Sequence, residues 1–164
     1  MSTDLDRWNA LPREEAIREM LAHCGSRAWA AAMASARPLP DAGAVLEAAD
    51  GAWSRLTDED RREAFAAHPR IGDRAAAGQA AREQAGAAAA SATTRDELAR
   101  ANEDYERRFD RIFLVCATGK TAAEMLALCR QRLHNDPATE FAIASEEQRK
   151  ITQLRLERWL TSPA

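Results

Sequence analysis

Residues 94–117, TRDELARANEDYERRFDRIFLVCA, carry the clearest helical pattern in the chain. Thr94 and Glu97 have the spacing of a capping box, in which side chains bond exposed backbone N–H groups at the start of a helix. Further side chains then recur every three or four residues, the period of a helix with one buried face: Leu98, Asn102, Tyr105, Phe109, Ile112, Phe113 and Cys116. We therefore predict a long helix that begins near Thr94 and buries this stripe.

Similar start signals divide the rest of the chain into helices. Thr121 and Glu124 form a second capping box, and acidic or hydroxyl residues precede several other apolar runs. We predict helix starts at Pro12, Ser26, Asp41, residues 57–60 and Pro137. We also predict helix in the alanine-rich run 75–92, with Gly78 and Gly86 as a break and an end.

The composition favours the same fold class. Alanine contributes 38 of the 164 residues, whereas there are only two valines and five isoleucines. Alanine is the strongest helix former, and β-branched residues favour strands. We predict an all-α fold, a single compact bundle-like domain of seven or eight helices that spans residues 1–164.

Charge, hydropathy and cysteine usage exclude several classes of protein. The net charge is -3, whereas a nucleic-acid coat needs a basic excess. No apolar run approaches the roughly 20 residues that span a bilayer, and residues 1–7 lack the features of a signal peptide. Three cysteines without CxxC spacing indicate reduced thiols, so we expect a cytoplasmic protein without a disulfide framework or a metal site.

His68 is the histidine best placed for acid–base chemistry. His23 and His134 also lie near predicted helix ends, where a partial cation complements the helix dipole. His68 differs because Pro69 fixes the exit of the chain and Gly72 lets the following loop turn sharply. A histidine held at the mouth of a loop suits an acid–base role; a buried, hydrogen-bonded structural histidine is the alternative.

Two further sites stand out from their surroundings. Glu83 and Gln84 are nearly the only functional groups in the alanine-rich run, although a solvated helix face would also explain them. Arg155 belongs to the predicted last helix. On a helical wheel of 100° per residue with Ile151 as origin, Arg155 lies at about +40°, in the middle of the apolar face of that helix. Its partner is therefore a protein carboxylate or an anionic ligand, with Arg158 as a competitor for that role.

Five motifs in order resemble one family. They are His68-Pro-Arg-Ile-Gly-Asp73, Glu83-Gln-Ala-Gly86, Asn102-x-x-Tyr105-x-x-x-Phe109, Phe113-Leu-Val-Cys-Ala117 and Lys150-Ile-x-x-Leu-Arg-Leu156. Together with Ser26-x-x-Trp29 and Arg37-Pro38 upstream, they are similar to the decarboxylases of 2-oxo-4-hydroxy-4-carboxy-5-ureidoimidazoline (OHCU). The resemblance extends from about Leu5 to Leu160.

The resemblance implies a carboxy-lyase that converts OHCU into (S)-allantoin and carbon dioxide in urate degradation. It implies an all-helical protein that needs no cofactor and often forms a homodimer. It makes His68 the catalytic histidine and assigns the substrate contacts to Pro69, Glu83, Gln84, Leu114, Val115 and Arg155. We expect His68, Glu83 and Arg155 to converge on one small cavity.

Two departures from the family pattern bear on substrate choice. Ala80 stands where the family usually has serine, and Asp110 stands where a glycine commonly follows the phenylalanine. A lyase or hydrolase acting on a related ureido acid is therefore one alternative. A non-catalytic helical binding module is the other, and it would show an exposed apolar patch in place of a pocket.

Overall fold

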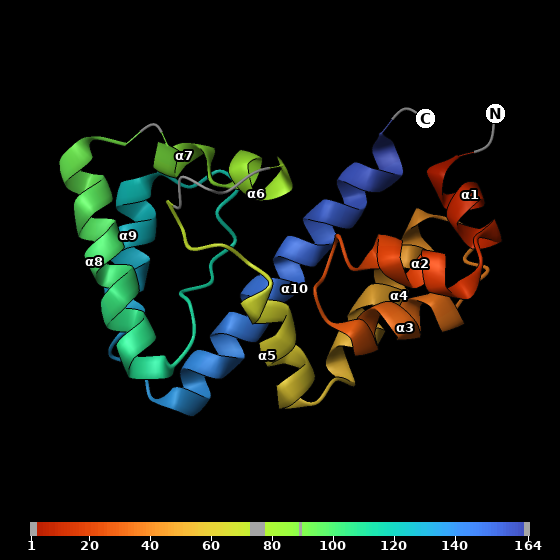
Figure 1. The fold of residues 1–164 in the computed structure, drawn as a ribbon, viewed down its shortest axis with the longest axis horizontal. Coiled ribbons are helices and arrows are strands. Elements are labelled where there is room, and N and C mark those ends of the chain that lie inside the picture. The colour runs from red at the N-terminus through yellow and green to blue at the C-terminus, as the bar shows by residue number, and fades with distance from the viewer. Residues whose placement is uncertain (1–2, 73–77, 89, 163–164) are drawn as a thin grey trace. The chain divides into compact units, whose positions relative to one another are not determined.

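The computed structural model describes residues 3–72, 78–88 and 90–162, and every regular element in these ranges is a helix (Figure 1). The predicted all-α fold is therefore confirmed. Contacts between residues group the chain into two compact units. Unit 1 comprises the described residues of Met1–Ala64 and Arg149–Ala164, and unit 2 those of Phe65–Gln148. The expected single domain stays a prediction.

Unit 1 contains four short helices, most of α5 and the second part of α10: α1 (Asp4–Ala10), α2 (Arg13–Met20), α3 (Arg27–Ser35), α4 (Ala42–Ser54), α5 (Asp58–Ala66) and α10 (Pro137–Thr161). Ser26 and Asp41 cap α3 and α4 through their side-chain oxygens, as predicted. The core contains two fully buried tryptophans, and their indole N–H groups donate to the carbonyls of Ala16 and Ala49. Each large ring is thus buried without an unsatisfied donor.

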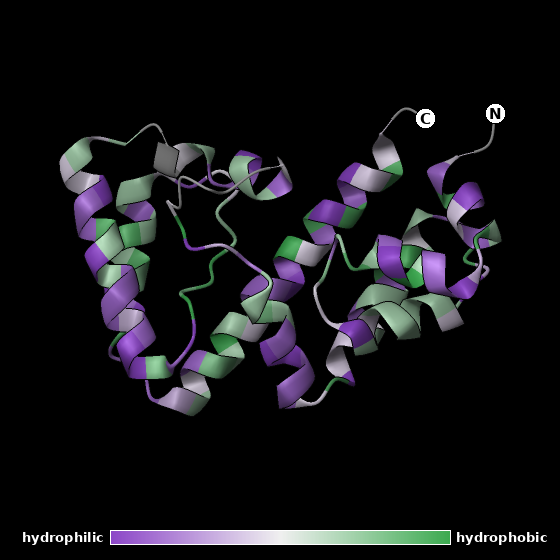
Figure 2. Ribbon diagram, viewed as in Figure 1, coloured by the Kyte–Doolittle hydropathy of each residue, from purple (hydrophilic) through white to green (hydrophobic). Residues whose placement is uncertain are grey.

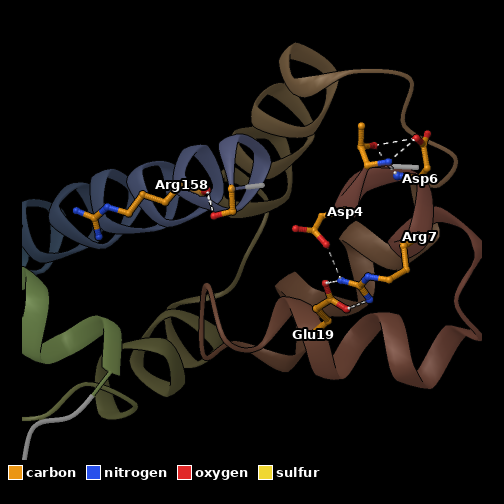
Figure 3. Close-up of polar contacts among 7 residues, drawn as sticks. Asp4, Asp6, Arg7, Glu19 and Arg158 are labelled. Carbon is orange, nitrogen blue, oxygen red and sulfur yellow. Dashed lines mark hydrogen bonds and ion pairs between the residues drawn. The ribbon is translucent and has the colours of Figure 1, made fainter. Parts of the chain in front are cut away.

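Helix α1 is not among the helices predicted from the sequence. Thr3 caps it, and the Asp6 carboxylate accepts the Thr3 N–H in return, which completes a capping box with Asp in place of Glu or Gln. The two terminal nitrogens of Arg7 donate hydrogen bonds to the two carboxylate oxygens of Glu19 in α2, at 2.9 and 2.6 Å (Figure 3). This fork fixes the short helix to its neighbour.

Unit 2 is built on α8 (Ala92–Phe109), α9 (Ala122–Arg132) and the first part of α10, with α6 (Gly78–Glu83) and α7 (Ala85–Ala88) before them. Cys129 lies against the Ala101 carbonyl, and Arg108 donates to the Asn135 carbonyl. Because these partners are 28 and 27 residues apart, α8 and α9 run side by side in the same direction (Figure 1). The segment between them carries the chain back along their length.

This return segment corrects the predicted long helix. Helix α8 is capped by Ser91 rather than Thr94, and it ends at Phe109 because Asp110 adopts a left-handed conformation with φ 56°. Residues 112–117 form neither helix nor strand; they run back along α8 (Figure 1) and are buried from Phe113 onward, and Figure 2 shows them as a hydrophobic strip. The stripe beyond Phe109 is thus a buried, non-helical segment. A left-handed residue favours glycine, which gives a physical reason for glycine at this position in the family pattern.

The alanine-rich run forms two short helices. The predicted helix over 75–92 appears as α6 and α7, separated at Gln84, while residues 73–77 and 89 lie outside the described ranges. A Cβ on Gly86 would lie 2.1 Å from the Lys120 carbonyl oxygen. Glycine therefore lets α7 pack directly against the backbone that precedes α9.

Candidate active site

His68 lies just beyond α5, half-buried, on the loop that leads away from that helix. Its Nε2 lies 2.7 Å from the side-chain Oε1 of Gln148, a fully buried residue of α10. Pro69, which is also half-buried, follows directly. The imidazole is therefore anchored on one nitrogen within unit 2.

Three side chains hold the loop that follows His68. Asn102 of α8 donates to the Ile71 carbonyl at 3.1 Å, and Gln84 accepts the Gly72 N–H at 2.9 Å. Arg70 pairs with both Glu106 carboxylate oxygens, at 2.6 and 2.7 Å. Gly72 has φ +81° and makes the turn. Asp73, the last residue of the motif, lies outside the described residues.

Glu83 is the last residue of α6, and Gln84 follows it before α7, within the same unit. Gln84 is buried, and its Oε1 is the acceptor for the loop amide, so it links α6 to the His68 loop. Glu83 is half-buried. Burial raises the pKa of the Cys116 thiol, Lys120 opposes the shift, and the carboxylates of Glu147 and Glu83 add to it. Both carboxylates thus lie within electrostatic range of the return segment.

The backbone of that segment is fixed by two basic side chains. Arg132 donates to the Leu114 carbonyl and Lys120 to the Cys116 carbonyl, each at 2.7 Å. Leu114 and Val115 are buried. A non-helical segment inside a protein must find partners for its peptide groups, and here long side chains supply them.

A buried polar network holds Arg132 in turn. Its Nε donates to Glu140 at 2.7 Å, and the Tyr105 hydroxyl donates to the same oxygen at 2.6 Å. Asn135 donates to the second carboxylate oxygen at 3.0 Å. Burial and the hydrogen bond to Glu140 raise the pKa of Tyr105. The network thus keeps Tyr105 protonated and the carbonyl of Leu114 in place.

Arg155 lies in unit 1 and is half-buried between the buried residues Ile151 and Leu156. Burial lowers the pKa of His23 to about 4, and the Arg155 charge adds to that shift. Burial raises the pKa of Cys24 to about 11. Because Arg155 belongs to unit 1 and the other predicted site residues to unit 2, the expected convergence with His68 and Glu83 stays a prediction.

Gln148 and the Arg132–Glu140 pair are not among the residues predicted from the sequence. Gln148 was detectable: on the wheel used for Arg155 it falls near about +60°, also within the apolar face. A buried amide on an apolar face needs a partner, as a buried guanidinium does. The Arg132–Glu140 pair joins two helices and has no local pattern.

The described residues contain neither a cluster of metal ligands nor a membrane-spanning helix. In residues 3–72, 78–88 and 90–162, no three metal-ligating side chains cluster together. Within the same part of the chain, no helix combines the length and apolarity that a bilayer crossing requires.

Solved structures share this fold. A structure described as OHCU decarboxylase in the presence of (S)-allantoin aligns with 88% of this chain and 98% of its own, with a TM-score of 0.80 and 34% identity. A structure of (S)-allantoin synthase aligns with 97% of this chain and 54% of its own, with a TM-score of 0.74 and 16% identity. At that identity the second match shows the fold alone.

The family follows from the sequence comparisons. The family model described as OHCU decarboxylase matches residues 9–157, so the chain belongs to the OHCU decarboxylase family. The predicted resemblance is therefore confirmed.

Relatives with established names agree with this membership. The uric acid degradation bifunctional protein TTL of Arabidopsis thaliana is 38% identical over 149 residues, which cover 86% of this chain and 46% of that protein. The OHCU decarboxylase of Amia calva is 38% identical over 81 residues, 49% of this chain and 46% of that protein. The Haloferax volcanii decarboxylase is 26% identical over 138 residues, 82% of each. The alignments thus span about half the length of the first two relatives.

Proposed function

We propose that this protein decarboxylates OHCU to (S)-allantoin in urate degradation, without a cofactor. The observation that carries the proposal is the anchored loop of unit 2, in which His68 contacts Gln148 while Asn102, Gln84 and Glu106 hold the residues that follow. This loop carries the first of the five motifs on which the family resemblance rests. A fixed imidazole beside fixed polar groups suits a reaction that depends on orientation and one proton transfer.

The chemistry needs few groups from the protein. The bond between the ring carbon and the carboxylate breaks, its electron pair moves into the adjacent ring C=N, and carbon dioxide leaves. The nitrogen takes up a proton and the carbon that bears the ureido group takes up another on one face, while the hydroxyl proton leaves to form the ring carbonyl of (S)-allantoin. In this proposal His68 is the acid–base group beside the reacting carbon, and fixed dipoles stabilise the charge that develops on nitrogen.

The remaining assignments follow the family motifs. Glu83 and Gln84 bind the ureido and ring nitrogens, with the Gln84 amide group acting while its Oε1 holds Gly72. Pro69 and the backbone at Leu114 and Val115 line the substrate site. Arg155 binds an anionic or carbonyl edge of the substrate; this assignment rests on its motif and on guanidinium chemistry.

The proposal extends to assembly and location. We infer a cytoplasmic protein because all three cysteines, each within the described residues, are buried free thiols. A homodimer and a single functional domain are further parts of the proposal, supported by the family resemblance. Sedimentation velocity would test the dimer, and a monomer at all concentrations would contradict it.

Activity is tested with OHCU made fresh from urate by the two preceding enzymes. Spontaneous decay gives racemic allantoin, so we expect this protein to produce a rapid circular dichroism signal of one sign. Decay at the spontaneous rate would favour a non-catalytic binding module. Because Ala80 replaces the usual serine, related ureido acids are tested in parallel. Faster turnover of one of these would favour the alternative function, a lyase or hydrolase that acts on a related ureido acid.

His68→Asn should lower the rate by about 10²-fold or more, as the loss of an acid–base group commonly does. Far-ultraviolet circular dichroism and thermal melting serve as controls and should match the parent protein. A fully active His68→Asn variant would remove His68 from the mechanism.

Arg155→Ala should raise KM by about 10-fold or more with a smaller change in kcat, since a charged hydrogen bond to substrate contributes about 1.5–3 kcal/mol. Arg158→Ala on the same helix is the matched control, because Arg158 is exposed. A variant that loses stability while its folded fraction keeps normal kinetics would show that Arg155 is a structural residue.

A further inference from the structure

We propose that Gln148 is a positioning residue that selects the ring nitrogen through which His68 exchanges its proton. The proposal rests on the decarboxylase function proposed above. Gln148 belongs to α10, some 80 residues from His68 in sequence, and its Oε1 lies 2.7 Å from the His68 Nε2. The contact falls within unit 2.

The chemistry of the two groups fixes the direction of the bond. An amide oxygen only accepts hydrogen bonds, so the Nε2 that faces it carries the proton. In the neutral imidazole the other nitrogen, Nδ1, is then unprotonated and acts as the acceptor. Nδ1 is therefore the atom that takes a proton from the substrate or returns one to it.

The burial of Gln148 stabilises the His68 tautomer that is protonated on Nε2. Gln148 is fully buried, whereas His68 is half-buried, so water cannot replace the amide oxygen on the Gln148 side. With the Gln148 amide in this orientation, the opposite tautomer would place two acceptors against each other, at the cost of an unsatisfied buried group. The ring also loses rotational freedom, which keeps Nδ1 in one direction.

A neutral amide and a carboxylate beside Nε2 differ in their effect on the charge of the His68 ring. A carboxylate in the same place would also accept the Nε2 proton, but it would stabilise the imidazolium and raise the pKa of the histidine. Gln148 thus orients the ring without adding a negative charge beside it. This distinction supplies the test.

The experiment compares Gln148→Met, Gln148→Glu and Gln153→Met. Methionine keeps the length of the side chain and removes the acceptor. We expect Gln148→Met to lower kcat by about 10- to 100-fold, the usual effect of losing an orienting partner of a functional histidine, while KM changes less than threefold. Gln153 lies on the same helix, bonded to Asp50 and Leu46 in unit 1, and its variant should keep the parent kcat.

Gln148→Glu should retain much of the activity and move the pH-dependent limb of kcat controlled by His68 to higher pH. Nitrogen NMR of the imidazole, with His68→Asn to assign the signal, should show protonated Nε2 and unprotonated Nδ1 in the neutral parent protein. Gln148→Met should give a mixture of tautomers. This readout requires no turnover, so it separates a failure of the inference from a failure of the decarboxylase proposal.

Two results would overturn the proposal. One is a neutral parent protein with the proton on Nδ1, and the other is a Gln148→Met variant with unchanged kcat and an unchanged tautomer. If Gln148→Met does not fold, Gln148→Glu decides, because an active variant with an unshifted pH limb also excludes the positioning role.

Discussion

His23 in unit 1 and His68 in unit 2 both lie just beyond a helix end, yet their surroundings differ. His23 is buried against the Trp159 ring, its Nδ1 has no hydrogen-bond partner among the described residues, and its pKa falls to about 4. His68 is half-buried and has Gln148 opposite Nε2. Burial thus favours the neutral form of His23, whereas His68 is anchored on Nε2 and stays partly exposed.

The contrast extends to other buried groups of unit 2. Arg132 and Glu140 are almost completely buried, and their charges meet each other and the Tyr105 hydroxyl. Partners of this kind hold backbone that the family resemblance assigns to the substrate.

Arg132→Met gives the largest expected effect, a loss of about 3–5 kcal/mol in the free energy of unfolding, because Glu140 would remain buried without its cation. Arg130→Met is the matched control on the same helix, since its pair with Glu97 is exposed; it should cost at most about 1 kcal/mol. Urea unfolding measures both. Equal losses would show that burial of the pair makes no difference.

The pH dependence of stability tests His23. Its pKa is about 4 in the folded protein and 6.5 ordinarily, so the unfolded chain takes up the proton first as the pH falls. Its contribution is complete above about pH 6.5 and is lost progressively down to about pH 4, by about 3 kcal/mol in total. His23→Phe removes this titration.

Between pH 7.5 and pH 4, the free energy of unfolding of His23→Phe should therefore fall by about 3 kcal/mol less than that of the parent protein, as measured by denaturant unfolding. The difference between the two proteins cancels the other titrating groups. Parallel losses in both would contradict the proposed neutral state of His23.

Asp110→Gly gives the smallest effect, a gain of at most about 1 kcal/mol, because glycine adopts the left-handed conformation without steric cost. Asp110→Ala should change stability in the opposite direction. Thermal melting would detect either change as a shift of about 2–4 °C in Tm. A less stable glycine variant would show that the Asp110 side chain contributes more than its backbone conformation costs.

Much of the fold could be predicted from local chemistry. Ser26, Asp41 and Thr121 cap the helices that they were expected to cap. The end of α8 could not be predicted, because apolar spacing continues past Phe109 and neither glycine nor proline marks the turn. The partners that make a non-helical segment stable there, Arg132 and Lys120, come from later in the chain.

The candidate site divides in the same way. His68 could be singled out because Pro69 and Gly72 mark its loop, and motif order supplied the other assignments. Gln148 could not be assigned a role because a single amide on a helix belongs to no motif, although its position on the apolar face follows from the sequence. The network around Glu140 depends on contacts between helices, which no local pattern encodes.

The buried stretch from Phe113 to Ala117 is anchored through carbonyl oxygens. Every amino acid carries that same oxygen, so exchanges among apolar side chains of similar volume should leave the anchoring intact. The side chains of this stretch can therefore change during evolution while its backbone conformation is kept. Homologues compared by identity alone would make it look less constrained than it is.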